Sequence, residues 1–228
     1  MLSSWGVTFE GVDLEKDPDR WADLKRLNIP SYPATILGDR VVHGWNPKAL
    51  AALVGVDYDP GKRFTPEELA AKLDTILAAD QRALRQIPRE HLGMKHPERD
   101  RTVRELGFHI FRVGLSFPEA RATGYFPETW LRENPSADMA DGHAVARYGD
   151  MVRERVRAWA TQPGWCDGSV ETYYGAIAAW DFMERTTWHA AQHLRQVYWF
   201  LERMGVTPEA RLTDDDLKGL PLPREVWS

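Results

Sequence analysis

The sequence predicts an α+β protein in which a small β-α-β-β-α region precedes an up-down four-helix bundle. Three observations predict it: strand-like and helical patterns alternate early in the chain, a turn-rich segment follows, and four long segments then carry apolar residues at helical spacing. We therefore expect an N-terminal region, a linker, the bundle and an irregular C-terminal tail, with the bounds 1–56, 57–64, 65–206 and 207–228.

In the N-terminal region, strand-prone residues such as Val7 and Phe9 come before a charged segment with apolar residues on one helical face. The dipeptide Gly38-Asp39 then separates two short strand-like runs, as in a β-hairpin. The predicted order is strand, helix, hairpin and helix, at 7–12, 13–27, 34–37 with 40–43, and 47–54.

Each bundle helix shows apolar residues at three- and four-residue steps. Thr65 and Glu68 form a capping-box pattern at the first helix, whereas Pro118 is expected to end the second because proline breaks helix interiors. The predicted helices cover about 65–87, 100–117, 143–159 and 172–204. The tail is expected to pack back over the surface through Leu217, Leu220 and Trp227.

Composition and charge limit the partners. The chain has 228 residues, 43% of them hydrophobic, and a net charge of -5 without a long basic run, so nucleic acid is not an expected partner. It contains neither an apolar run long enough to cross a membrane nor a basic-then-apolar leader, and we expect a cytoplasmic protein that does not bind membranes. The single cysteine, Cys166, cannot form an internal disulfide.

Three histidines predict a metal site. His189 and His193 are four residues apart and therefore share one face of the fourth helix, while His109 lies on the apolar side of the second. The alternative is that these are core imidazoles satisfied by hydrogen bonds, and His143 is a reserve ligand. Three histidines with an open fourth position are typical of a catalytic centre, for which zinc is the first choice, then nickel or iron.

Two segments carry a family resemblance. RELGFHI at 104–110 and ERTTWHAAQHLRQ at 184–196 resemble the histidine motifs of the DinB-like metal-binding four-helix family. The resemblance implies a divalent metal held by His109, His189 and His193, in a family that includes thiol-dependent transferases and maleylpyruvate isomerases. A thiol such as glutathione would lose its proton at the metal and could attack an electrophilic small molecule.

Charged residues near these histidines are further candidates. Arg185 lies one turn before His189, and Arg112 lies three residues after His109, so either could bind a carboxylate of the thiol or the substrate. Asp181 could orient an imidazole. For the arginines the alternative is a solvated bundle rim, and for the aspartate it is an exposed salt bridge.

Residues 7–55 resemble the later part of a glutaredoxin-like thioredoxin fold, with Ser31-Tyr32-Pro33 at the position of the cis-proline turn. The resemblance implies that Tyr32 and Pro33 contact a thiol peptide. No CxxC motif occurs, so thiol-disulfide exchange is unsupported. The first strand and helix of such a fold are missing, and we expect Met1 to be an internal start; otherwise 7–12 should pair directly with 34–37.

Two functions remain open at this stage. The first is a metal-dependent thiol transferase or isomerase acting on a small molecule. The second is a non-catalytic metal- or ligand-binding bundle whose N-terminal region is an interaction module. The sequence does not decide between a monomer and a homodimer.

Overall fold

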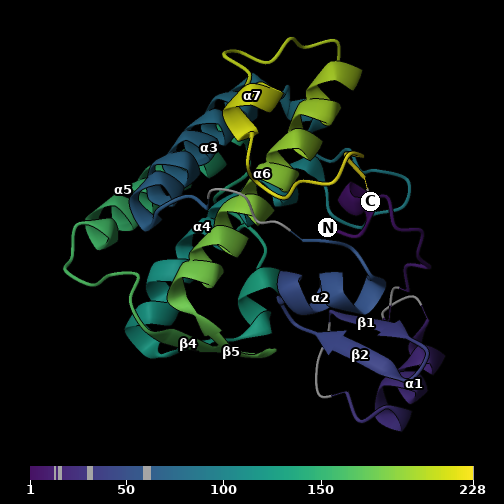
Figure 1. Ribbon diagram of the computed structural model, residues 1–228. Helices are drawn as coiled ribbons and strands as arrows, with labels where there is room; N and C mark the ends of the chain where they lie inside the picture. Colours follow the sequence, from purple (N-terminus) through teal and green to yellow (C-terminus); the bar gives the residue numbers. More distant parts are fainter. Residues whose placement is uncertain (13, 15–16, 30–32, 59–62, 228) are drawn as a thin grey trace.

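The computed structural model describes residues 1–12, 14, 17–29, 33–58 and 63–227. It is an α+β protein made mainly of helices, as predicted. Four long helices pack against one another, and a small region with a two-stranded sheet lies at one end of them (Figure 1). The long helices are α3 Pro66–Gln86, α4 Val103–Thr123, α5 Gly142–Ala160 and α6 Ala179–Arg203.

Local sequence signals fix where these helices start. Thr65 caps α3 and Thr102 caps α4, each in a reciprocal capping box with a glutamate three residues later. Asp141 caps α5 by accepting a hydrogen bond from the backbone of Ala144. Such caps satisfy amide groups that the first helical turn leaves unpaired.

The expected end of the second helix at Pro118 is wrong, because α4 continues to Thr123 and ends at Gly124 in a left-handed conformation. Proline removes one backbone hydrogen bond and costs about 3 kcal/mol in a helix interior. Here α4 is buried along most of its length, including Phe117 and Ala120 on either side of the proline. Packing of these side chains offsets the local cost.

The fourth helix is shorter than predicted. Residues 169–178 form a β-hairpin instead of its first turns, and β3 Tyr125–Phe126 pairs in parallel with the first hairpin strand. Val170 and Thr172 are buried while Ser169 and Glu171 are exposed, which is the two-residue period of a strand. The hairpin strands are β4 Ser169–Thr172 and β5 Gly175–Ala178.

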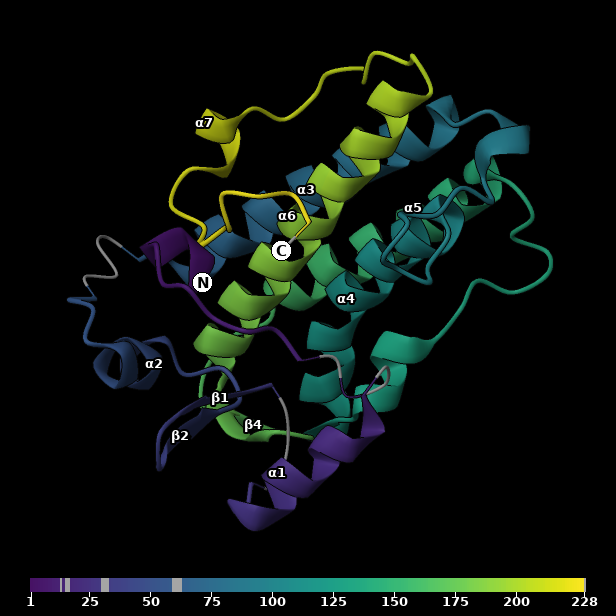
Figure 2. The ribbon, with the colours of Figure 1, turned by 90° about the vertical axis from the view of Figure 1, so that its right-hand side faces the viewer.

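The order of helix directions also differs from the up-down expectation. Gly114 of α4 contacts Val152 of α5, and Phe111 contacts Gly149, so the two helices run parallel. The connection 124–141 therefore returns along the length of the bundle, as Figure 2 shows. A chain of that length extends far enough, at about 3.3 Å per residue, to span a helix that rises about 1.5 Å per residue. The bundle is up-down-down-up.

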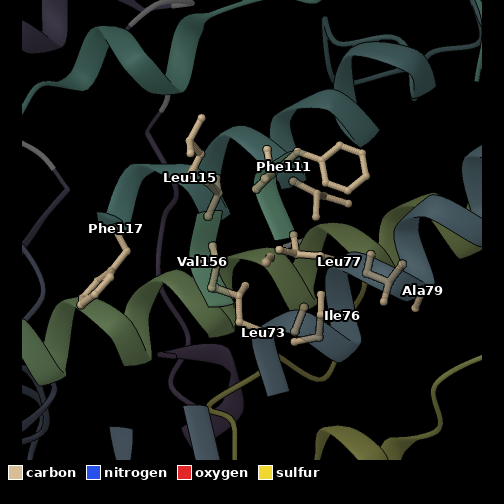
Figure 3. Packing of buried hydrophobic residues seen from close by; sticks show 14 of the residues in the cluster. Leu73, Ile76, Leu77, Ala79, Phe111, Leu115, Phe117 and Val156 are labelled. Carbon is tan, nitrogen blue, oxygen red and sulfur yellow. The ribbon is translucent and has the colours of Figure 1, made fainter. Parts of the chain in front are cut away.

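The core lies between α3, α4, α5 and α6. Figure 3 shows how Leu73, Ile76 and Leu77 of α3 meet Phe111 of α4 and Val156 of α5. All five are buried, and full burial of such side chains contributes about 1.5 to 3 kcal/mol each. This core holds the helices that carry the histidines.

The N-terminal region keeps the predicted hairpin and last helix. β1 Ala34–Leu37 pairs antiparallel with β2 Arg40–His43, and α2 Pro47–Val54 follows. The predicted helix at 13–27 is reduced to a 3-10 turn, Pro18–Arg20, and α1 Trp21–Arg26.

The predicted strand at 7–12 is wrong. Its residues are described, yet they form no strand and do not pair with β1. Phe9 is 49% exposed and Val12 39% exposed, so the apolar side chains that suggested a strand have no sheet face to cover. A complete thioredoxin-like unit is therefore not seen in the described residues.

The tail packs back over the bundle, as predicted. Leu217 and Leu220 are buried in the core, and Trp227 packs against it. The tail is not wholly irregular, because Thr213 caps a short helix, α7 Asp214–Leu217. Both ribbon views show the tail passing over α6 (Figures 1 and 2). Within the described part of the chain, no helix is both long and apolar enough to cross a bilayer.

Candidate metal centre

The structure brings together the three histidines that the sequence singled out. His109 on α4 and His189 and His193 on α6 offer ligand atoms that all lie within 4.8 Å of one another. The Nε2 atoms of His189 and His193 are 2.9 Å apart. His143, the reserve ligand, is exposed in the first turn of α5 and is not part of this cluster.

Helix geometry explains the cluster. The four-residue spacing puts His189 and His193 on one face of α6. His109 meets His193 and Phe117 meets Phe182, so α4 runs antiparallel to α6. The ring centroid of His109 is 5.4 Å from that of His189 and 4.9 Å from that of His193. His109 is buried, while the other two are partly buried.

Burial keeps all three imidazoles neutral. It lowers the pKa of His109 and His189 well below the ordinary value of 6.5, and the neighbouring imidazole of His193 adds to the effect in both. Burial also lowers the pKa of His193 to about 4. Neutral imidazoles keep a nitrogen lone pair at pH 7, which a metal ion requires.

Hydrogen bonds fix the orientation of His193. Its Nδ1 is 2.6 Å from Oε1 of Gln196, whose amide nitrogen donates to the Val226 carbonyl at 3.0 Å. The Gln196 oxygen must therefore accept, so His193 carries its proton on Nδ1 and its Nε2 keeps a lone pair. Orientation of a ligating histidine by an outer hydrogen bond is usual at metal sites.

The nitrogen atoms of the cluster fit a divalent cation. The Nδ1 atoms of His109 and His189 are buried without a hydrogen-bond partner. The Nε2 atoms of His189 and His193 face each other at a separation close to the roughly 3 to 3.5 Å between two nitrogens that bind one zinc ion. Three neutral nitrogen donors suit zinc, nickel or iron alike.

The two candidate arginines differ sharply. Arg185 on α6 is 9% exposed, and its guanidinium lies 5.2 Å from the ring centre of Tyr174. Arg112 is 3% exposed and forms ion pairs with Glu133 at 2.6 Å and Glu119 at 2.9 Å. Because two carboxylates already meet its charge, the predicted role of Arg112 in binding has no support in this arrangement.

Asp181 forms the salt bridge that was the alternative to orienting an imidazole. Its carboxylate accepts a hydrogen bond from Arg63 at 2.6 Å, and Arg63 also pairs with Glu184 at 3.4 Å. Arg63 in turn lies over the ring of Trp180. These contacts tie the start of α6 to the segment before α3.

The N-terminal region touches the bundle beside the metal centre. Gly44 donates to the Pro33 carbonyl at 2.8 Å and lies against Tyr174. The ring of Trp45 is 5.2 Å from that of Trp188, the neighbour of His189. Pro33 is itself exposed.

Tyr32 lies outside the described residues, so its predicted role cannot be placed. Nothing in the sequence indicated that Trp45 and Tyr174 belong to this site. Trp45 follows β2 and Tyr174 lies between β4 and β5, and no local pattern indicates that these two segments meet. Gln196 was detectable only by its spacing of three residues after His193.

The C-terminal tail packs along α6, next to the histidine cluster. The side chains of Trp188, Gln192 and Arg195 donate hydrogen bonds to backbone carbonyls of residues 221–226. Trp227 stacks on His96 with ring centroids 4.2 Å apart. The tail thus shields one side of the histidine cluster from water.

Comparison with known proteins adds no relative to this picture. A scan against protein-family models finds no model that matches the chain, and a search of curated proteins likewise finds no match.

Proposed function

We propose that this chain is a DinB-like, divalent-metal-dependent thiol transferase or isomerase that acts on an electrophilic small molecule. The observation that carries the proposal is the cluster of three neutral imidazoles from two facing helices. The resemblance of 104–110 and 184–196 to the DinB-like histidine motifs supports it. Zinc is the first candidate, with nickel and iron as alternatives.

His109, His189 and His193 would hold the ion, and three protein ligands leave a position for an exchangeable molecule. A divalent ion there supplies acidity, since it lowers the pKa of a thiol that binds to it. Glutathione or a similar low-molecular-weight thiol is the proposed co-substrate.

The surrounding residues would prepare the site. Gln196 fixes which nitrogen of His193 is available. Trp188 lies beside His189 and contacts Trp45 of the N-terminal region, and the C-terminal tail covers α6. A site shielded from water in this way strengthens electrostatic interactions with a bound anion.

One observation favours the second candidate, a non-catalytic metal- or ligand-binding protein. In the part of the chain that the structure describes, no carboxylate hydrogen-bonds to the three imidazoles. A general acid or base is therefore not evident beside them. In this alternative the N-terminal region serves as an interaction module.

Calorimetry separates thiol activation from mere metal binding. Zinc-loaded protein is titrated with glutathione in buffers of different ionisation enthalpy, and release of about one proton is expected because the thiolate is the ligand. Equally tight glutathione binding after chelation would overturn the proposal. Turnover with a panel of electrophiles then distinguishes an enzyme from the binding protein.

A further inference from the structure

Arg185 is a nearly buried cation on α6. Buried arginines are almost always paired, and Arg112, which is similarly buried, meets Glu119 and Glu133. Among the described residues no carboxylate forms an ion pair with Arg185, and the neighbouring Asp181 and Glu184 pair with Arg63. The hydroxyl of Tyr173 lies within its hydrogen-bonding reach, but a neutral phenol does not balance a positive charge.

Aromatic rings surround this arginine, and unpaired hydrogen-bond donors occur in the same part of the fold. Its guanidinium is 5.2 Å from the ring centre of Tyr174 and 6.0 Å from that of Phe126. The hydroxyl of Tyr174 is buried and has no partner, and neither does the buried indole nitrogen of Trp45. Buried donors without partners are uncommon and costly, so an unpaired hydroxyl on a ring that contacts an unpaired cation points to a missing acceptor.

These residues come from separate parts of the chain that meet here. Tyr174 lies in the turn between β4 and β5, and Arg185 lies on α6. Gly44 closes over Tyr174, because a Cβ atom on Gly44 would be 3.1 Å from the Tyr174 ring. Trp45 follows Gly44 and contacts Trp188. The N-terminal region therefore completes the cluster.

The charged side chains that act on the three imidazoles are arginines, although the whole chain carries a net charge of -5. The charged side chains that act on His109 and His189 are Arg101 and Arg185, and those that act on His193 are Arg99 and Arg101. No carboxylate is among them. Such a concentration of one sign attracts ligands of the opposite sign.

We propose that Arg185, Tyr174 and Trp45 form a subsite for the carboxylate group of a small molecule, about one helical turn from the histidine cluster. The inference rests on the proposed function only in taking that cluster as the reacting site. A single guanidinium balances a carboxylate, with which it can form two parallel hydrogen bonds, whereas a phosphate dianion would leave a buried negative charge.

The helix sets the distance between the two sites. Arg185 and His189 are four residues apart on α6, so their Cβ atoms are about 5 to 6 Å apart. A molecule that uses both sites has its carboxylate a few bonds away from its reacting atom. Because Arg185 and Tyr174 are nearly buried and Gly44 packs against Tyr174, binding of such a molecule would require the turn at Gly44 to shift.

Four small probes test this in the full chain, with chelator and again with zinc. They are propionate, its neutral amide, 2-mercaptoethanol and 3-mercaptopropionate, and binding is measured by ligand-observed NMR and calorimetry. Propionate should bind with chelator present and propionamide should not. On zinc-loaded protein, 3-mercaptopropionate should bind more tightly than either propionate or 2-mercaptoethanol, because it reaches both sites.

Variants locate the carboxylate. Arg185→Gln should lower the affinity for propionate and 3-mercaptopropionate about tenfold or more, as expected for loss of a charged hydrogen bond. It should leave the zinc content and the binding of 2-mercaptoethanol unchanged. Tyr174→Phe, which keeps the ring and the charge, should weaken propionate by a smaller factor. Arg203→Gln is the matched control, since Arg203 also lies on α6 and over an aromatic ring, that of Trp199, but is exposed.

The outcomes separate this inference from the proposed function. The subsite is overturned if propionate binds no better than propionamide. It is also overturned if propionate binds equally well to wild type, Arg185→Gln and Tyr174→Phe. An equal loss in Arg203→Gln overturns it as well, because the effect would then reflect net charge. If 2-mercaptoethanol fails to bind the zinc-loaded protein while propionate binding still requires Arg185, the carboxylate subsite is supported and the proposed thiol activation is rejected.

Discussion

The Gln196 side chain accepts a hydrogen bond from Nδ1 of His193 at 2.6 Å and donates one to the Val226 carbonyl at 3.0 Å. One amide therefore links a candidate metal ligand to the C-terminal tail. Because the amide nitrogen is engaged by the tail, the oxygen must face the imidazole, and Nε2 of His193 is the nitrogen left for a cation. The tail thus helps to set the chemistry of the site.

Replacing Gln196 should weaken metal binding without removing a ligand. We expect Gln196→Leu to lower zinc affinity about 10- to 100-fold, the usual effect of losing an outer hydrogen bond to a ligating histidine. Competition with a chromophoric chelator measures this. Gln192→Leu is the matched control, because the Gln192 side chain also donates to Val226 but its described hydrogen bonds, to Val226 and from Arg195, include no histidine. An equal loss there would assign the effect to the tail alone.

Each histidine of the cluster should be needed for metal. His109→Ala, His189→Ala and His193→Ala should each lose most bound zinc and the rise in melting temperature that zinc gives, because binding to the folded form adds to its stability. Elemental analysis and thermal unfolding check this. His143→Ala should behave as wild type. A full equivalent of tightly bound zinc in any of the three variants would show that the ligand assignment is wrong.

Asp80 should make the protein less stable as the pH rises. It is fully buried, neither carboxylate oxygen has a partner, and burial raises its pKa well above 3.8. Above that pH the unfolded chain loses the proton while the folded chain keeps it, so folding is penalised increasingly. Asp80→Asn should remove this penalty, and its stability advantage in urea unfolding should be larger at pH 7 than at pH 4.

Asp74 on the same helix should show the opposite dependence. Burial acts to raise its pKa, but hydrogen bonds and charge from Arg153 and Arg157 outweigh burial and lower it. A lowered pKa contributes stability above the unfolded value of 3.8 that is lost as the pH falls. Asp74→Asn should therefore be destabilising at pH 7 and less so at acid pH. Parallel pH trends in the two variants would contradict both assignments.

Gly44 should control how the N-terminal region docks. A Cβ atom there would lie 3.1 Å from the Tyr174 ring and 3.2 Å from its carbonyl oxygen, at a φ of +70°. Gly44→Ala should loosen the contact and speed tryptic cleavage between α2 and α3. Gly38→Ala is the control: Gly38 also has a positive φ, which costs about 1 to 2 kcal/mol for alanine, but a Cβ atom there would have no neighbour within 4 Å. Equal cleavage rates in the two variants would mean that backbone strain alone accounts for the effect.

The sequence by itself determined the helices and the histidines. Apolar spacing and capping residues act within a few positions, so the starts of α3 and α5, and the shared face of His189 and His193, follow from local geometry. The hairpin of β1 and β2 was predictable for the same reason, because Gly38-Asp39 is a local turn signal. Each of these features depends on residues close together in the chain.

Only the tertiary structure decided what meets across the fold. Four features reflect packing between distant segments. They are the parallel course of α4 and α5, the continuation of α4 through Pro118, the hairpin at 169–178, and the absence of a strand at 7–12. Arg112 and Arg185 looked alike in sequence, yet one meets two glutamates and the other none. Local periodicity says which face of a helix is apolar. It does not say which charged residue a crossover loop places opposite that face, and this depends on the packing of the whole bundle.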